Sequence, residues 1–289
     1  MTGVSEFAPA KVNLCLHITG RRPDGYHLLD SIVAFADVGD DLSIGPANSY
    51  SLDIAGPYAH ALSDEPDNLI TRAARELGGD ALRAAVQLEK RLPVAGGIGG
   101  GSANAAAALR GLMRLSAQQQ PSSEALGAIA LRLGADVPAC LVSSVLRMRG
   151  IGELIDELDP LPRVPAILVN PGIPVPTGPI FTALALEKGA SAKEGVGELP
   201  QTGFRDVTAL AAWLDTRRND LQPPAISLVP ELNDVLATIR AQRGCLLSRM
   251  SGSGATCFGL FETTEAAQRA AEVLKHDKPE WWSVATVLS

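Results

Sequence analysis

Residues 92–107 read Leu-Pro-Val-Ala-Gly-Gly-Ile-Gly-Gly-Gly-Ser-Ala-Asn-Ala-Ala-Ala, and they carry the strongest local signal in the chain. Five of the six positions 96–101 are glycine, and a backbone without Cβ atoms can bring its amides close to a bound anion. Residues 84–88 before this loop predict a strand, and the alanine-rich residues 103–115 after it predict a helix. A helix N-terminus attracts negative charge, so this order of elements indicates a nucleotide phosphate site. A flexible glycine turn is the alternative.

Two better-known phosphate loops do not fit this stretch. A P-loop requires lysine after Gly101, where the chain has Ser102. No register of the glycines satisfies the G-x-G-x-x-G pattern of dinucleotide-binding enzymes. The P-loop and dehydrogenase interpretations are therefore disfavoured.

The composition describes a globular protein with a sizeable core. The chain has 289 residues, 46% of them apolar, and its 25 basic and 32 acidic side chains give a net charge of −7. This acidic balance argues against nucleic-acid and membrane partners. The N-terminal residues lack a secretory signal pattern, so a cytoplasmic protein with reduced thiols is expected. Zinc sites and a disulfide framework are disfavoured because the four cysteines are widely spaced: Cys15, Cys140, Cys245 and Cys257.

The patterning predicts an α+β protein of two domains, residues 1–150 and 151–289. Strands of an antiparallel sheet are expected at 8–18, 28–38, 40–45 and 50–54, and a helix at 67–77, capped by Asp67 or Asn68 and stopped by Gly78 and Gly79. A helix at 123–133, a break at 134–138 and a strand at 142–149 follow. The second half predicts strands at 166–170 and 256–261, helices at 179–185, 207–215 and 230–243, and loops at 187–205 and 248–255.

Lys11 and Asp136 are the candidates for acid–base chemistry. Lys11 lies inside an apolar strand, where a lysine is costly to bury without a partner, although it could also extend its ammonium to solvent. Asp136 stands between small residues before Pro138, a layout that can direct a carboxylate into a cleft or simply form a surface turn. If the two meet, the carboxylate can take a hydroxyl proton while the cation orients the hydroxyl, which is the minimal apparatus for phosphoryl transfer.

Two further motifs are suggestive. Residues 22–27, Arg-Pro-Asp-Gly-Tyr-His, combine a turn with an aromatic ring and an imidazole, which suits stacking on a flat heterocycle but also suits a simple turn with packed Tyr26. Residues 251–255, Ser-Gly-Ser-Gly-Ala, could form a second phosphate nest or a tight hairpin.

The order of these motifs resembles that of the GHMP kinases, the superfamily of galactokinase, homoserine kinase, mevalonate kinase and phosphomevalonate kinase. The resemblance extends over nearly the whole chain and is closest to the branch whose substrate is a cytidine diphosphate ester of methylerythritol. The matching stretches are residues 9–14, 23–27, 90–94 with 96–105, 133–138, 219–222 and 250–255.

The resemblance implies a two-domain GHMP kinase fold with the active site in the cleft between the domains. It implies ATP-dependent phosphorylation of the 2-hydroxyl of 4-diphosphocytidyl-2-C-methyl-D-erythritol in the non-mevalonate isoprenoid pathway. Asp136 would be the general base and Lys11 its hydrogen-bonded partner. Substrate-binding residues would be Asn13, Tyr26, His27, Thr177 and Phe181, with cytosine between aromatic rings. ATP-binding residues would be Asn68, Lys90, Pro93, Gly96, Gly97, Gly99, Gly100, Gly101, Ser102 and Asn104.

Two departures from the family pattern bear on the site. Ala103 stands where many relatives have a second serine, which removes a possible hydroxyl ligand for magnesium. Mg²⁺ is still expected with ATP, held largely by phosphates and water, and the sequence names no protein ligand for it. Val33 stands where a pocket phenylalanine is usual, so the pocket wall is roomier or filled from elsewhere.

Other functions remain open at this stage. A kinase of the same superfamily could act on a mevalonate-like, homoserine-like or sugar alcohol, although such substrates have no use for the Tyr26, His27 and Phe181 rings. A non-catalytic nucleotide-binding regulator on this fold would need neither Asp136 nor Lys11. The partners expected are ATP and a small molecule, and the protein is expected to be a monomer or a weak homodimer.

Overall fold

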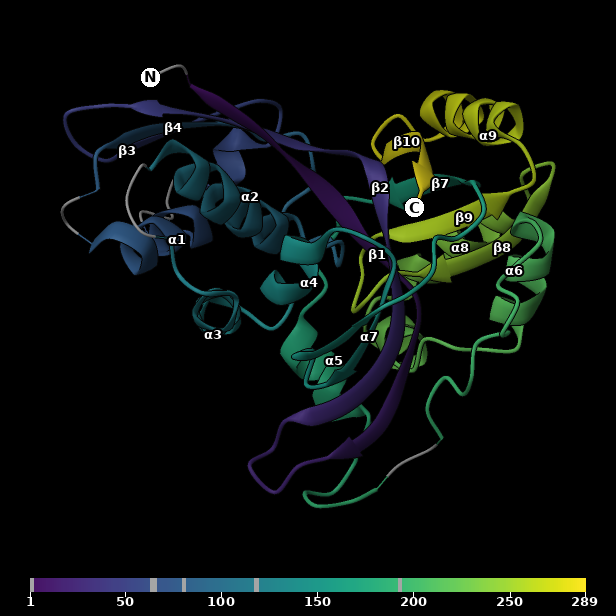
Figure 1. Cartoon of the computed structure of the whole chain (residues 1–289). Coiled ribbons are helices and arrows are strands. Elements are labelled where there is room, and N and C mark those ends of the chain that lie inside the picture. The colour runs from purple at the N-terminus through teal and green to yellow at the C-terminus, as the bar shows by residue number, and fades with distance from the viewer. Residues whose placement is uncertain (1–2, 63–66, 80–81, 117–119, 192–193) are drawn as a thin grey trace. The chain divides into compact units, whose positions relative to one another are not determined.

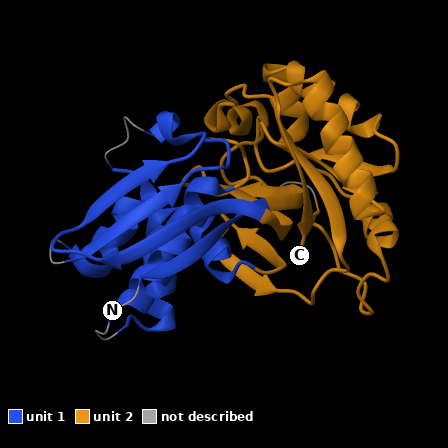
Figure 2. Ribbon diagram, turned by 90° about the horizontal axis from the view of Figure 1, so that it is seen from above, with its two compact units in different colours: residues 1–11, 38–94, 99–143 blue, residues 12–37, 95–98, 144–289 orange. Residues whose placement is uncertain are grey.

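The computed structural model describes residues 3–62, 67–79, 82–116, 120–191 and 194–289. The chain forms two compact units, each assembled from several segments rather than from one continuous half (Figure 2). Unit 1 comprises Met1–Lys11, Val38–Val94 and Gly99–Ser143, and unit 2 comprises Val12–Asp37, Ala95–Ile98 and Ser144–Ser289. Two long strands, β1 (Val4–Arg21) and β2 (His27–Pro46), therefore contribute residues to both units.

Unit 1 packs helices against a small sheet. Its part of β2 pairs antiparallel with β4 (Ala84–Glu89), and β4 pairs parallel with β3 (Ser51–Ala55), which is followed by the short 3-10 helix η1 (Ala59–Leu62). Helix α2 (Gly100–Leu115) packs against α1 (Leu69–Gly78) and α4 (Val137–Val142), while α3 (Ser123–Leu133) contacts α1 and α4 (Figure 1). The alanines of α2 are buried and small, so neighbouring backbones approach it closely.

Unit 2 is built on a mostly antiparallel sheet. Strand β10 (Trp282–Leu288) pairs with β2 and with β7 (Val164–Asn170), and β9 (Cys257–Phe261) joins β7 to β8 (Cys245–Met250). Strand β5 (Leu146–Gly150) lies between β2 and β6 (Leu154–Glu157). Helix α9 (Thr264–Asp277) covers β7 and β10, and α8 (Glu231–Arg240) covers β8 and β9. The other helices are α5 (Thr177–Ala183), α6 (Val207–Asp215) and α7 (Gln222–Leu228).

The predicted α+β class is confirmed, and α3 and α6 have the predicted bounds. The N-cap of α1 is Asn68, whose side chain accepts from the amides of Ile70 and Thr71, and the helix stops at Gly79 as expected. None of the helices in the described part of the chain is long and apolar enough to cross a membrane.

Several predicted elements need correction. The strands expected at 28–38 and 40–45 are one strand, β2. The turn-favouring residues Gly39 and Asp40 lie inside it, because Asp40 is held there by bonds from Lys90 and from the amides of residues 91 and 92. The sheet is not wholly antiparallel, since β3 pairs parallel with β4. The strand expected from Val142 begins only at Leu146, because residues 137–142 form α4, whose first turn tolerates Pro138.

The second half departs from the pattern in two places. Residues 248–250 belong to β8 rather than to the loop that follows, which shortens the small-residue turn. Helix α7 was missed because its adjacent prolines, Pro223 and Pro224, read as helix breakers, although both lie in the first turn, where no intrahelical amide bond is lost.

Candidate active site

Lys11 and Asp136 lie together in unit 1. Lys11 Nζ is 3.0 Å from Asp136 Oδ1, and the side chains are 4% and 40% exposed. Lys11 is carried by β1, whereas Asp136 is the N-cap residue of the short helix α4, where its own side chain makes no capping bond. The pair therefore combines a buried, fixed cation with a carboxylate that ligands can reach.

The start of helix α2 lies beside this pair. Its N-cap is Gly99, with φ 63°, and it has no side chain to accept the amide hydrogens of the first turn. A Cβ atom at position 99 would lie 3.1 Å from Cβ of Lys11, so the glycine backbone and the lysine stem are in close approach. Gly101 is exposed, Ser102 is half-buried, and Oδ1 of Asn104 is buried without a hydrogen-bond partner in the described part of the chain. Uncapped amides at a helix N-terminus, with a cation beside them, are suited to binding an anion.

Lys90 belongs to a buried ion pair that the sequence did not predict. Its Nζ donates to Asp40 Oδ2 at 2.6 Å, and both side chains are nearly inaccessible. Asp40 Oδ1 also accepts the backbone amides of Arg91 and Leu92, at 2.7 and 2.8 Å. Burial lowers the pKa of Lys90, although the charge of Asp40 opposes this shift. The ammonium lies 3.4 Å from where a Cβ of Gly100 would be, so this pair supports the backbone at the start of α2.

Asn13 stands at the centre of a polar network in unit 2. Its backbone amide donates to Ser251 Oγ at 3.1 Å, and this hydroxyl donates to the carbonyl of Gly97, also at 3.1 Å. Its side-chain amide donates to Ser31 Oγ at 2.8 Å, and Ser31 Oγ donates to the carbonyl of Cys15 at 2.6 Å. Ser251, the first residue of the stretch 251–255, therefore positions both Gly97 in the glycine segment and Asn13.

The turn after β8 is held from behind by Asn219. Its side-chain amide donates to the carbonyls of Met250 and Gly252, each at 2.8 Å, while its Oδ1 accepts the amide of Leu221 at 3.0 Å. Nearby, Thr177 Oγ1 and Ser253 Oγ are hydrogen-bonded at 2.9 Å. This turn links the predicted substrate residue Thr177 to the segment that holds Gly97.

The predicted aromatic residues gather at the start of β2 and in α5. The rings of His27 and Phe181 are 5.0 Å apart and tilted by 35°, while Tyr26 is 61% exposed. Nε2 of His27 is buried and has no partner among the described residues. Burial lowers the pKa of His27, and the nearby charge of Arg21 lowers it further. A neutral imidazole with one unpaired nitrogen is suited to a hydrogen bond with a ligand.

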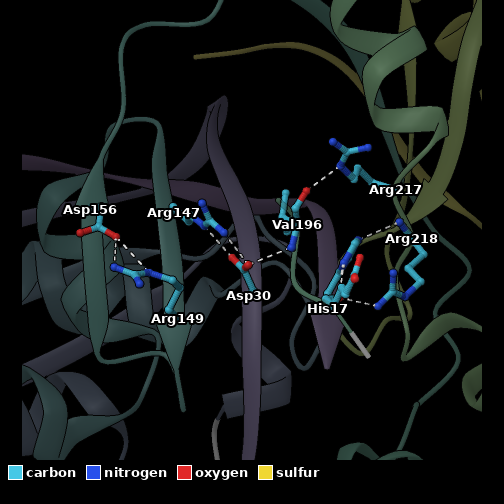
Figure 3. A network of polar contacts seen from close by, with 9 residues as sticks. His17, Asp30, Arg147, Arg149, Asp156, Val196, Arg217 and Arg218 are labelled. Carbon is cyan, nitrogen blue, oxygen red and sulfur yellow. Dashed lines mark hydrogen bonds and ion pairs between the residues drawn. The ribbon is translucent and has the colours of Figure 1, made fainter. Parts of the chain in front are cut away.

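A second polar network holds the segment 194–196 in unit 2 (Figure 3). Asp30 receives two bonds from Arg147, at 2.7 and 2.6 Å, and a third from the amide of Val196, at 2.8 Å. Burial alone would raise the pKa of Asp30, but these donors outweigh it and the pKa is lowered. The carbonyl of Val196 accepts from Arg217 at 2.7 Å. The predicted loop 187–205 contains no helix or strand in its described residues, 187–191 and 194–205. The backbone amide and the backbone carbonyl of Val196 both anchor it here.

The remaining predicted positions are described by their burial and hydrogen bonds. Pro93 and Gly96 are buried, and the carbonyl of Gly96 accepts the amide of Thr256 at 2.9 Å. Val33 is fully buried within β2, opposite Leu146 of β5. Asn68 Oδ1 already accepts two backbone amides, from Ile70 and Thr71. Lys90 Nζ donates one of its three hydrogens to Asp40.

Sequence reasoning missed several supporting residues. Asp40 could have been found from strand alternation, because it shares a face with Leu42 and Ile44, both buried. Ser31 carries no local signal, since its role depends on Asn13, which lies 18 positions away.

Comparisons with known proteins agree with the predicted fold class and family. The family model for the GHMP kinases N terminal domain matches residues 68–144, and the model for GHMP kinases C terminal matches residues 198–279. The crystal structure of a homoserine kinase from Cytophaga hutchinsonii has the same fold, with a TM-score of 0.66 at 18% identity over 100% of this chain and 95% of that one.

Proteins with higher sequence identity to this chain show which branch of the GHMP kinases it belongs to. A 4-diphosphocytidyl-2-C-methyl-D-erythritol kinase of Cereibacter sphaeroides is 54% identical over 277 residues, 96% of each chain. One of Paramagnetospirillum magneticum is 50% identical over 285 residues, 98% of this chain and 97% of the other. The crystal structure of a 4-(cytidine 5'-diphospho)-2C-methyl-D-erythritol kinase has a TM-score of 0.78 at 36% identity, covering 99% of both chains. The chain therefore belongs to the GHMP kinases and, within them, to the 4-diphosphocytidyl-2-C-methyl-D-erythritol kinase family.

Proposed function

We propose that this protein transfers the γ-phosphoryl group of ATP to the 2-hydroxyl of 4-diphosphocytidyl-2-C-methyl-D-erythritol. The observation that carries the proposal is the Lys11–Asp136 pair, 3.0 Å apart, next to the glycine start of α2. Unlike the buried Asp40 beside Lys90, Asp136 is 40% exposed, so its carboxylate is within reach of a substrate. This favours a reaction over binding alone, because binding an anion needs only the cation and the amides.

Asp136 takes the proton of the hydroxyl as its oxygen attacks the γ-phosphorus, and ADP leaves with the electrons of the broken phosphorus–oxygen bond. Lys11 holds the carboxylate in place and offsets charge that develops on the transferring group. The exposure of the Asp136 side chain, 40% against 4% for Lys11, supports this division of roles.

ATP is proposed to bind with its phosphates on the glycine segment, using the amides of Gly96, Gly97, Gly99, Gly100 and Gly101 and the hydroxyl of Ser102. Asn104 Oδ1, which has no partner among the described residues, could accept a bond from a hydroxyl or amino group of the nucleotide. Asn68, Lys90 and Pro93 remain proposed neighbours of the nucleotide. Mg²⁺ would supply further charge neutralisation and would be held by phosphates and water. Within the described ranges, no three His, Cys, Asp or Glu side chains cluster in a way that could hold a metal ion.

The cytidine end of the substrate is proposed to lie at Tyr26, His27 and Phe181, with Thr177 and Asn13 as further contacts. Nε2 of His27, which has no partner in the part of the chain that the structure describes, supports base recognition there, and the exposed Tyr26 ring is available for stacking. A mevalonate-like or homoserine-like substrate would leave these groups without a partner. The 47–54% identity to kinases of the cytidine-containing substrate also favours this branch.

An ADP-release assay on the full chain tests the proposal. The enzyme is given ATP with 4-diphosphocytidyl-2-C-methyl-D-erythritol, with mevalonate and with homoserine in parallel. We expect kcat/KM for the cytidine-containing substrate to exceed the others by several orders of magnitude. Equal or greater turnover of mevalonate or homoserine would contradict the substrate assignment, and release of ADP with none of them would contradict the proposed kinase activity.

We also propose a cytoplasmic enzyme that is a monomer or a weak homodimer. The four cysteines are free, and burial raises the pKa of Cys15 to about 11 and that of Cys140 to about 12, so these thiols resist reaction. Sedimentation at several protein concentrations would separate the two oligomeric states.

A further inference from the structure

Arg21 joins two segments of unit 2 that carry the aromatic side chains of the proposed cytidine site. It is the last residue of β1, and His27 is the first residue of β2. Its Nε donates to the carbonyl of Gly25 at 3.1 Å, and its Nη1 donates to the carbonyl of Leu186 at 2.7 Å. One guanidinium therefore bonds to the β1–β2 turn and also to the chain just after α5.

Each of these two segments carries one ring of the His27–Phe181 pair. The turn leads directly into Tyr26 and His27, and it is closed by backbone bonds from Arg22 N to Tyr26 O and from Gly25 N to Arg22 O, at 2.8 and 2.9 Å. On the other side, Leu186 lies five residues after Phe181, and both pack against the core of unit 2. The side-chain bonds of Arg21 thus connect the carriers of the His27 and Phe181 rings.

The backbone of Arg21 strengthens the same connection. Its amide donates to the carbonyl of Ala190 at 2.9 Å, and its carbonyl accepts the amide of Gly189 at 2.8 Å. Arg21 accordingly makes four hydrogen bonds that tie the turn and the segment 186–190 together. Its charge also lies close enough to lower the pKa of His27, after the larger effect of burial.

We propose that Arg21 is a positioning residue for nucleobase recognition, an inference that rests on the proposed function. Arg21 sets the distance between the turn that bears Tyr26 and His27 and the segment that bears Phe181. This role requires no contact with ATP or with the reacting hydroxyl. The guanidinium suits this task because its rigid fork donates in two directions at once, whereas a lysine ammonium is a point charge on a flexible stem. Loss of Arg21 would loosen the ring arrangement without altering Lys11 or Asp136.

The test compares Arg21→Lys and Arg21→Gln with wild type in steady-state kinetics on the full chain. We expect KM for 4-diphosphocytidyl-2-C-methyl-D-erythritol to rise about tenfold in both variants, as for the loss of one or two net hydrogen bonds. We expect kcat and KM for ATP to change less than about twofold. Cytidine monophosphate, used as a competitive inhibitor that carries the base but not the methylerythritol, should show the same rise in Ki as the substrate shows in KM.

Arg22→Ala is the matched control. Arg22 is the next residue, its side chain is 43% exposed, and it pairs on the surface with Asp24 at 2.7 Å. This variant should keep substrate KM within about twofold of wild type, because exposed pairs contribute little. A rise as large as that of the Arg21 variants would overturn the proposal, since the effect would then reflect positive charge near the turn.

The remaining outcomes separate this inference from the proposed function. If wild type does not turn over the substrate, the proposed function fails, whatever the Arg21 variants do. If wild type is active and the Arg21 variants keep its substrate KM, the positioning role is wrong. It is also wrong if kcat falls while KM and the Ki of cytidine monophosphate stay unchanged.

Discussion

Lys11 and Asp136 show why single residues in this chain have to be judged by their surroundings. Lys11 has 4% of its side chain exposed, and a buried ammonium persists only where a partner offsets its desolvation. Asp136 supplies that partner and yet remains 40% exposed. The pair can thus be stable and still leave a carboxylate oxygen for a ligand.

Asp136→Asn tests the proposed general base. The amide keeps the size and one acceptor oxygen of the carboxylate but does not take up a proton at neutral pH. We expect kcat to fall by roughly 10²–10⁴-fold, the usual contribution of a general base, while the dissociation constant for ATP stays near wild type. Single-turnover kinetics together with calorimetric ATP binding measure the two quantities. An unchanged kcat would exclude Asp136 from proton transfer.

Lys90→Met tests the buried pair beneath α2. Because this change leaves the Asp40 carboxylate buried without its cation, we expect the free energy of unfolding in urea to fall by about 3–5 kcal/mol. Arg91→Ala is the control, since Arg91 forms an exposed ion pair with Asp41 that should be worth about 0–1 kcal/mol. Equal losses in the two variants would show that the Lys90–Asp40 pair adds nothing beyond a surface contact.

At the scale of elements, the glycine segment is shaped by the turn after β8 as well as by its own flexibility. Gly97 has φ 71°, and a Cβ there would lie 2.6–2.8 Å from backbone atoms of Gly254 and Ser251. Such distances cannot be relieved by turning a side chain. The interlocked turns are a reason for glycine at this position that does not depend on a bound phosphate.

Gly97→Ala should therefore disturb both turns. We expect the free energy of unfolding to fall by more than about 1 kcal/mol, because the variant combines a left-handed backbone with contacts below van der Waals distance. KM for ATP should rise as the segment shifts. Gly127→Ala is the control: Gly127 lies within α3 with open space around it, so alanine there should stabilise the protein by about 0.5–1 kcal/mol. A Gly97→Ala protein as stable as wild type would contradict the interlocking.

At the scale of the whole molecule, stability depends on contacts between residues far apart in the chain. His17 illustrates this, because its ring joins β1 to positions 177 and 201 residues later. The amide of Arg218 donates to Nε2 at 3.2 Å, so Nδ1 carries the proton of the neutral ring and donates to the carbonyl of Glu194 at 3.3 Å. Protonation of Nε2 would set its N–H against the backbone N–H of Arg218, next to the positive charge of the Arg218 side chain.

This contact predicts how stability changes with pH. Burial lowers the pKa of His17 below its ordinary 6.5, and the charge of Arg218 lowers it further, while Asp220 opposes the shift. The unfolded chain therefore takes up a proton that the folded protein resists. The contribution of His17 is fully present above about pH 6.5 and is lost as the pH falls from there toward the folded pKa.

Thermal unfolding at a series of pH values measures the effect. We expect the midpoint of wild type to fall below about pH 6.5 and His17→Gln to show a flatter profile, since glutamine has no charge to gain. His276→Gln serves as the control because His276 is exposed at the end of α9, and it should retain the slope of wild type. A slope that is unchanged in His17→Gln would assign the pH dependence to other groups.

Local signals explain how much of the fold was predictable. The caps of α1 and the bounds of α3 and α6 follow from Asn68, Gly79 and the helical period, because these features act within a few residues. The full length of β2 was not predicted, because Gly39 and Asp40 within it favour turns locally. Helix α7 was not predicted at all, since Pro223 and Pro224 are tolerated only because they lie in its first turn.

The sequence by itself determined the candidates for chemistry: a lysine in an apolar strand, an aspartate before a proline, and glycines ahead of an alanine-rich helix. Each of these is a local property of residue type and spacing. Only the tertiary structure decided which side chains meet, because Lys11 with Asp136, Lys90 with Asp40, and Arg21 with Leu186 are separated by 125, 50 and 165 positions. Contacts at such separations depend on how strands pair and pack, which no short stretch of sequence specifies.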